Sequence, residues 1–88
     1  MPDYSVTFAR SARKELERLP SSTAQRVIQR IERLGISPRP PGAIKLQGQK
    51  NLWRIRIGDY RMIYSIDDSA HVIDISAIRH RQDVYRDL

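Results

Sequence analysis

The hydrophobic residues of this chain of 88 residues change their spacing twice, and that change limits the folds the chain can adopt. Residues 4–8 alternate apolar and polar side chains, which predicts a short strand with one buried face. Over residues 9–34 the apolar positions recur at helical spacing, in two stretches that Pro20 separates. A loop rich in proline and glycine follows at residues 35–43, and the alternation then returns. We therefore predict the order strand, helix, helix, loop and further strands.

Three segments typical of strands follow the loop, at residues 52–57, 60–66 and 71–78, with short polar turns between them; the first alternates clearly, and the last is the most apolar run of the chain. Such spacing predicts an antiparallel meander. In the first segment one face carries Trp53, Ile55 and Ile57, and the opposite face carries Arg54 and Arg56. Packing the two helices as a hairpin on the apolar face leaves the arginine face open. The prediction is one α+β domain over residues 1–88: an N-terminal strand and helical hairpin packed on a small twisted antiparallel sheet, with a short C-terminal helix.

Arginine dominates the charge of the chain. Lys and Arg total 16 against 10 Asp and Glu, which gives a formal net charge of +6, and only Lys14, Lys45 and Lys50 are lysines. Guanidinium groups form paired hydrogen bonds with phosphates or carboxylates and keep their charge when partly desolvated, which favours an anionic partner. A GC-rich genome would produce the same bias, so composition alone leaves nucleic acid and acidic protein open as partners.

The composition also excludes several classes of protein. The chain has no cysteine and only two histidines, which rules out a thiol nucleophile and a zinc tetrahedron, and no cofactor is expected. No stretch approaches about 20 apolar residues, so no membrane span is expected. The sequence starts Met1-Pro2-Asp3 without a secretion leader, and a cytoplasmic location is expected.

Basic residues concentrate in one part of the predicted sheet. Residues 45–61 hold five cations and one acid, a local balance of +4, and the cations are Lys45, Lys50, Arg54, Arg56 and Arg61. Nearby, the end of the last strand and the tail add Arg79, His80, Arg81 and Tyr85. This group suits the scissile phosphate of RNA, because the 2′-hydroxyl attacks and the enzyme has to position it, neutralise charge and move protons. The alternative interpretation of alternating arginines is a solvated strand face without a ligand.

The sequence resembles the RelE/ParE superfamily of toxins from bacterial and archaeal type II toxin–antitoxin systems. The resemblance is carried by the segments KLQG, LWRIRIGDYRMIYSID and IRHRQDVYR, preceded by KELERLP and an SPRPPG loop, and it spans nearly the whole chain. It implies a compact fold in which a helical hairpin packs on a twisted antiparallel sheet. RelE-like members of the superfamily enter the ribosomal A site and cut mRNA by 2′-hydroxyl attack without a metal.

The resemblance also implies roles for individual residues. Arg54, Arg56 and Arg61 would bind and neutralise the phosphate, Arg81 would assist the leaving 5′-oxygen, and Tyr85 would orient or deprotonate the hydroxyl and stack on a base. From the concentration of charge, and not from the resemblance, Lys45, Lys50, Arg79 and His80 are expected to add contacts to the RNA. Some members carry lysine at the positions of Arg54 and Arg56. Because a guanidinium accepts protons very poorly at neutral pH, the role of general base moves here to Tyr85 or His80.

The resulting functional prediction is a ribosome-dependent, metal-independent mRNA endonuclease toxin that acts at the 30S A site. A small acidic RelB-like antitoxin would neutralise it in a hetero-oligomeric toxin–antitoxin complex. Two alternatives stay open: a ParE-like toxin that inhibits DNA gyrase and has no nuclease activity, and a degenerate homologue that binds only antitoxin and operator DNA.

Overall fold

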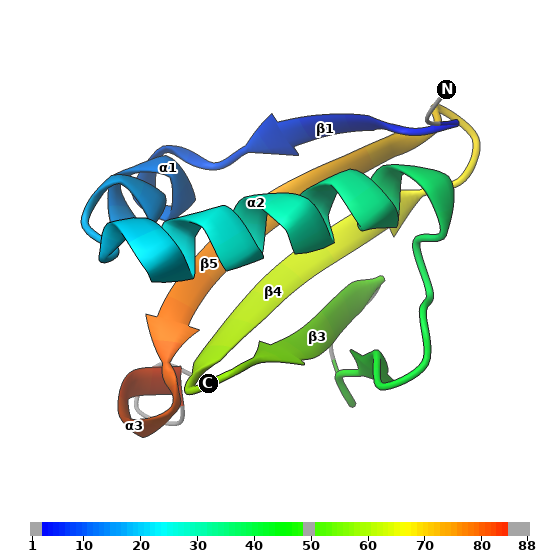
Figure 1. Cartoon of the computed structure of the whole chain (residues 1–88). Helices are drawn as coiled ribbons and strands as arrows, with labels where there is room; N and C mark the ends of the chain where they lie inside the picture. The colour runs from blue at the N-terminus through cyan, green and yellow to red at the C-terminus, as the bar shows by residue number, and fades with distance from the viewer. Residues whose placement is uncertain (1–2, 49–50, 85–88) are drawn as a thin grey trace.

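A computed structural model describes residues 3–48 and 51–84 of the chain and has the expected α+β class (Figure 1). The elements in chain order are β1 (Ser5–Phe8), α1 (Arg10–Glu17), α2 (Ser21–Ile36), β2 (Ile44–Lys45), β3 (Leu52–Ile57), β4 (Tyr60–Asp67), β5 (Val72–His80) and α3 (Arg81–Val84). Among the described residues, no helix is both long enough and apolar enough to cross a membrane.

One five-stranded sheet has the strand order β1-β5-β4-β3-β2. The predicted meander of β3, β4 and β5 is antiparallel throughout, with a register irregularity between Ile63 and Tyr64. Two features differ from the expected antiparallel sheet. β1 joins the edge of β5 in parallel, and the short strand β2 extends the other edge from the segment between the predicted loop and β3. The sheet is therefore mixed, because alternation along a strand reports its faces and not the direction of its neighbour.

The main core lies between α2 and one face of the sheet (Figure 1). Helix α2 contributes the buried side chains of Val27, Ile31 and Leu34. The strands contribute Ile55, Ile57, Met62, Tyr64, Ile66, Ile73, Ile75 and Ile78, and Trp53 packs partly buried against them. This arrangement confirms the predicted apolar face of β3.

The opposite face of the sheet is not wholly polar. Ile63 and Ala77 lie opposite one another on β4 and β5 and form a small buried cluster with Leu46 and Leu52. Arg54 pairs with Ile63 across β3 and β4, so it borders this cluster and is half-buried. The arginine face predicted to be open is therefore open mainly at the β3–β4 turn.

Helix α1 covers the part of β5 that β1 does not reach. β1 ends opposite Ile75, where the N–H of Ala9 donates to the Ile75 carbonyl at 2.9 Å. Further along the edge, the Glu15 carboxylate accepts the backbone N–H of Ile78 at 3.1 Å. The Glu15 side chain thus accepts a backbone N–H at the strand edge that would otherwise have no partner.

A polar cluster closes the far end of the sheet. The Asp68 carboxylate accepts the Tyr4 hydroxyl at 2.6 Å and two donors from Arg39 at 2.8 and 3.3 Å. The Arg39 guanidinium also lies over the Trp53 ring, 5.4 Å from its centroid. These contacts fix the proline-rich loop to the β4–β5 turn.

Candidate nucleic-acid interface

Three arginines form a row across three adjacent strands. Arg56 on β3 lies directly opposite Arg61 on β4, and Arg61 lies opposite Arg79 on β5. Like charges that face one another across strands are destabilising, so the fold carries an electrostatic cost at this row. An anion bound against the row would remove that cost, which makes these residues the centre of the candidate site.

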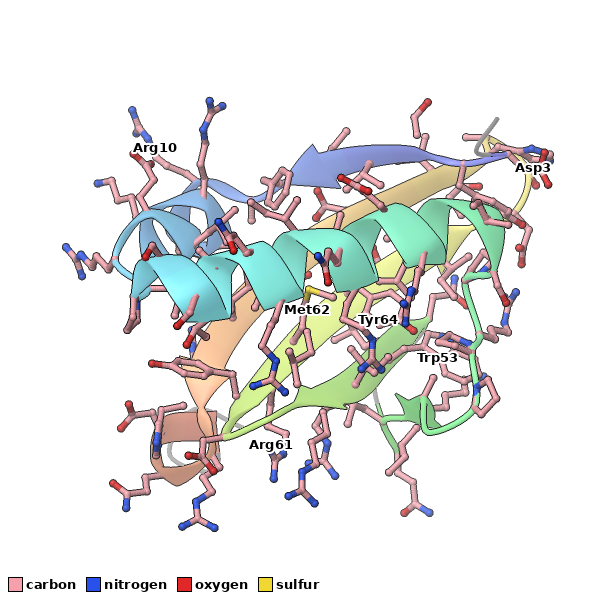
Figure 2. All side chains as sticks on the ribbon, in the orientation of Figure 1. Asp3, Arg10, Trp53, Arg61, Met62 and Tyr64 are labelled. Carbon is pink, nitrogen blue, oxygen red and sulfur yellow. The ribbon has the colours of Figure 1, made fainter. Side chains whose placement is uncertain are left out.

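The carbonyl of Gly58 in the β3–β4 turn brings two of these guanidinium groups together. It accepts Nε of Arg56 at 3.3 Å and Nη1 of Arg61 at 3.2 Å, and Nη1 of Arg61 also donates to the Tyr60 carbonyl at 3.0 Å. Figure 2 shows Arg61 on the side of the sheet away from α2, whereas Met62 and Tyr64 point toward the helix. Within the described residues neither Arg56 nor Arg61 forms an ion pair. Their positive charge is therefore available to a ligand.

Arg81 begins the C-terminal helix beside the same turn. Its backbone N–H donates to the carbonyl of Asp59 at 2.7 Å, and its side chain is exposed. The Gly58-Asp59 turn consequently joins β3, β4 and the start of α3, and it places Arg81 near the pair formed by Arg56 and Arg61.

Arg79 differs from the other members of the row because it has a carboxylate partner. Its Nε lies 3.1 Å from Oε2 of Glu15 on α1, and both side chains are about one-quarter exposed. Part of its charge is thus compensated within the protein. This pair anchors the row to α1 at the end that lies on β5.

His80 lies on the other face of β5. It pairs with Tyr60 in the register, and the two rings meet edge to face with centroids 5.4 Å apart. Its Nδ1 accepts the backbone N–H of Gln82 at 3.2 Å, which in the neutral ring puts the proton on Nε2. Glu15 lines the same hollow, between α1 and the sheet. The structure therefore does not bring His80 together with Arg56 and Arg61.

The remaining predicted residues are placed in different ways. Lys45 is exposed and lies opposite Trp53 in the register, so β2 does not align it with the arginine row. Lys50 and Tyr85 lie outside the described residues. Their proposed roles rest on the sequence.

Two residues near the site have no role in the sequence-based prediction. Helical spacing predicts only that Glu15 lies in a helix, and its pairing with Arg79 and Ile78 depends on how α1 meets the edge of β5. Arg26, from the outer face of α2, places its guanidinium against Gly58: a Cβ on that glycine would lie 3.3 Å from Nη1 of Arg26. Helical periodicity assigns Arg26 to a solvent-facing position, and only the packing of α2 over the turn shows its neighbour.

The chemistry of the site is that of clustered guanidinium donors on a fixed backbone scaffold. Such donors can bind a phosphate bidentately and stabilise the negative charge that develops during phosphoryl transfer. The arginines would not themselves remove a proton at neutral pH. The arrangement suits a reaction in which the substrate supplies the nucleophile.

Comparison with known proteins links this geometry to one family. The family described as "ParE toxin of type II toxin-antitoxin system, parDE" matches residues 6–85. Among curated proteins, "Toxin RelE" and "Toxin RelG" of Mycobacterium tuberculosis are 32% and 31% identical to the chain over 84 residues. Each match covers 94% of this chain, with 87% of RelE and 97% of RelG.

Solved structures show the same fold. The archaeal RelE–RelB complex from Pyrococcus horikoshii OT3 contains a chain that is 33% identical, with a TM-score of 0.81 over 90% of this chain and 96% of that one. A chain of the toxin–antitoxin complex RelBE2 from Mycobacterium tuberculosis is 28% identical, with a TM-score of 0.77 over 92% of this chain and 100% of that one.

Proposed function

The chain belongs to the ParE toxin family of type II toxin–antitoxin systems, and from that premise we propose that it is a RelE-like endoribonuclease. The proposed toxin acts in the cytoplasm, enters the 30S A site of the ribosome and cleaves the mRNA held there without a metal ion. A small acidic RelB-like antitoxin neutralises it in a hetero-oligomeric complex.

The observation that carries this proposal is the pairing of Arg56 and Arg61 on the Gly58 carbonyl. In the proposed reaction the 2′-hydroxyl oxygen attacks the adjacent phosphorus, the bond to the 5′-oxygen breaks, and a 2′,3′-cyclic phosphate remains. Charge builds on the phosphate oxygens in the transition state, where preorganised cations act most strongly. Holding both guanidinium groups through one carbonyl supplies such preorganisation, and Arg54 would extend the cationic surface.

The proton transfers are assigned to the C-terminal segment. Tyr85 would orient the attacking hydroxyl or accept its proton, and Arg81, beside the same turn, would stabilise the departing 5′-oxygen, which takes up a proton from water. His80 faces the hollow beside Tyr60, so its position supports Tyr85 as the general base. A phenol with an ordinary pKa of about 10 needs nearby cations to favour its phenolate, and Arg81 is suited to this task.

The relatives favour the RelE-like function over gyrase inhibition. The two Mycobacterium tuberculosis relatives carry RelE and RelG names, and the structures from Pyrococcus horikoshii and Mycobacterium tuberculosis that match this chain come from RelE–RelB and RelBE2 complexes. ParE-like inhibition of gyrase remains the second candidate because the matching family description names ParE. DNA breaks without cleaved mRNA after induction would support that second function.

Induction of single variants followed by primer extension on mRNA tests the proposal. We expect Arg61→Ala, Arg81→Ala and Tyr85→Phe each to lower codon-linked cleavage at least about tenfold and to relieve growth arrest, because each removes a transition-state contact. Arg10→Ala, which removes an exposed arginine from α1, is the matched control and should cleave normally. Full cleavage by all three site variants would contradict the proposed active site.

A further inference from the structure

Three arginines from three different elements converge on Gly58. Arg56 and Arg61 donate to its carbonyl from β3 and β4, and the guanidinium of Arg26 on α2 lies on the side of the glycine where a Cβ would stand. A Cβ at Gly58 would lie 3.3, 3.5 and 3.7 Å from Nη1, Nη2 and Cζ of Arg26, so the guanidinium is seated on the glycine. The cationic site therefore continues from the open face of the sheet around the turn to the helical layer.

This position is unusual for an exposed arginine. A long cationic side chain on a helix surface gains entropy by spreading into water, and it has no electrostatic reason to approach two other cations. Arg26 also lies four residues from Arg30 on the same helix, and like charges at that spacing disfavour one another. Within the described residues, no ion pair compensates Arg26. The convergence is explained if an extended anion crosses the turn and contacts all three arginines.

We propose that Arg26 is a third RNA-binding arginine. It binds the phosphate adjacent to the one that Arg56 and Arg61 bind. This inference rests on the proposed function, because it needs a single RNA strand as ligand. Arg26 lies on the side of Gly58 where a Cβ would stand, whereas Arg56 and Arg61 donate to its carbonyl, so they would meet successive phosphates of a strand that passes over the turn. An RNA backbone provides such a series of regularly spaced charges.

Glycine at position 58 permits this arrangement for two reasons. Its φ of +59° lies in the left-handed region, which other residues adopt at an energetic cost. In addition, a side chain there would press on the Arg26 guanidinium. The turn can therefore support cations on both of its sides.

Binding of a non-cleavable 2′-O-methyl RNA, followed by fluorescence anisotropy over a range of salt concentrations, tests the role of Arg26. We expect Arg26→Gln to weaken binding about fivefold to tenfold and to lower the salt slope by about one, as for the loss of one phosphate contact. Arg26→Lys should keep the slope because it keeps the charge. Arg33→Gln is the matched control: it removes an exposed arginine seven residues further along α2, and it should bind like the unsubstituted protein.

A packing role for Arg26 predicts a different pattern. Arg26→Met keeps an apolar stem over Gly58 and removes the charge, so binding at the unsubstituted level by this variant would overturn the proposal. A salt slope unchanged in Arg26→Gln would also overturn it. A third result would overturn the proposal: substitutions of Arg26 that weaken only antitoxin binding would assign this residue to the antitoxin interface. Thermal unfolding of each variant establishes that the fold is intact.

Arg61→Gln separates this inference from the proposed function. If the unsubstituted protein binds the RNA, Arg61→Gln weakens binding and Arg26→Gln does not, then the role of Arg26 is wrong and the proposed function stands. If the unsubstituted protein neither binds the RNA nor cleaves mRNA on ribosomes, the proposed function is wrong and the inference is wrong with it.

Discussion

At the scale of single residues, the protein uses hydrogen bonds in opposite ways at the two ends of β4. Near Arg61, backbone carbonyls accept hydrogen bonds from the guanidinium, which fixes its position but does not neutralise its charge, so the charge can act on a ligand. Near Asp68, a carboxylate receives Arg39 and Tyr4 directly, and the charges compensate within the protein. The Tyr64 hydroxyl likewise donates to the Pro38 carbonyl, and burial raises the pKa of Tyr64 to about 12.

The cluster around Asp68 leads to a prediction about acid stability. Hydrogen bonds from Arg39 and Tyr4 hold the pKa of Asp68 below its ordinary value. The folded state therefore favours the carboxylate. The resulting stabilisation is complete above the unfolded pKa of about 3.9 and is lost as the pH falls through the lower folded value.

We expect Asp68→Asn to lower the urea midpoint slightly at pH 7. The difference between the urea midpoints at pH 7 and at about pH 3 should also become smaller, because residue 68 no longer titrates in this exposed cluster. Asp83→Asn, at an exposed position in α3, is the control and should leave this difference unchanged. If Asp68→Asn and the unsubstituted protein show the same difference in urea midpoint between the two pH values, the Asp68 carboxylate does not stabilise the fold as assigned.

At the scale of elements, helix α1 acts as a substitute for a strand at the edge of β5. The Glu15 carboxylate serves the Ile78 N–H and the Arg79 guanidinium together. Glu15→Ala should lower the free energy of unfolding by about 1–3 kcal/mol, because it leaves a partly buried backbone donor and a cation without their acceptor. Glu15→Gln should cost less, since an amide oxygen can still accept from Ile78.

Urea unfolding measures both changes. Glu17→Ala provides the control on the same helix, because Glu17 is exposed. Equal losses for Glu15→Ala and Glu17→Ala would show that the edge contact does not stabilise the fold.

The elements also show what the sequence could predict. Alternation on β3 correctly predicts that Ile55 and Ile57 are buried in the core and that Trp53 packs against it, and turn residues mark the meander. The same alternation places Arg79 and His80 on opposite faces of β5, although both line the hollow between α1 and the sheet. The parallel pairing of β1 and the contact of Arg26 with Gly58 depend on how distant segments pack. Spacing along the chain carries no information about such packing.

At the scale of the whole molecule, two surfaces of different chemistry are available to partners. The first is the arginine site at the β3–β4 turn. The second is an apolar groove between β1 and α2, lined by Tyr4, Ser5, Val6, Ile31, Glu32, Gly35 and Ile36. A charged surface binds in a way that salt weakens, whereas an apolar groove binds in a way that salt hardly affects.

We expect binding of the cognate antitoxin to depend on the arginine site. Its affinity should fall at least about tenfold between about 0.1 and 1 M NaCl, over which the screening length shrinks from roughly 10 to 3 Å. Isothermal titration calorimetry measures this change. Ile36→Ser, which alters the exposed edge of the groove, is the comparison variant. Affinity that persists in high salt and is lost in Ile36→Ser would place the antitoxin in the groove instead.

The distance between the cluster at Asp68 and the arginines at Gly58 has an evolutionary consequence. The two groups occupy opposite ends of β4, whose eight residues span roughly 25 Å. Substitutions at the β3–β4 turn can therefore accumulate while the anchoring of the proline-rich loop stays intact. A lineage can thus vary the residues of the turn without losing its architecture.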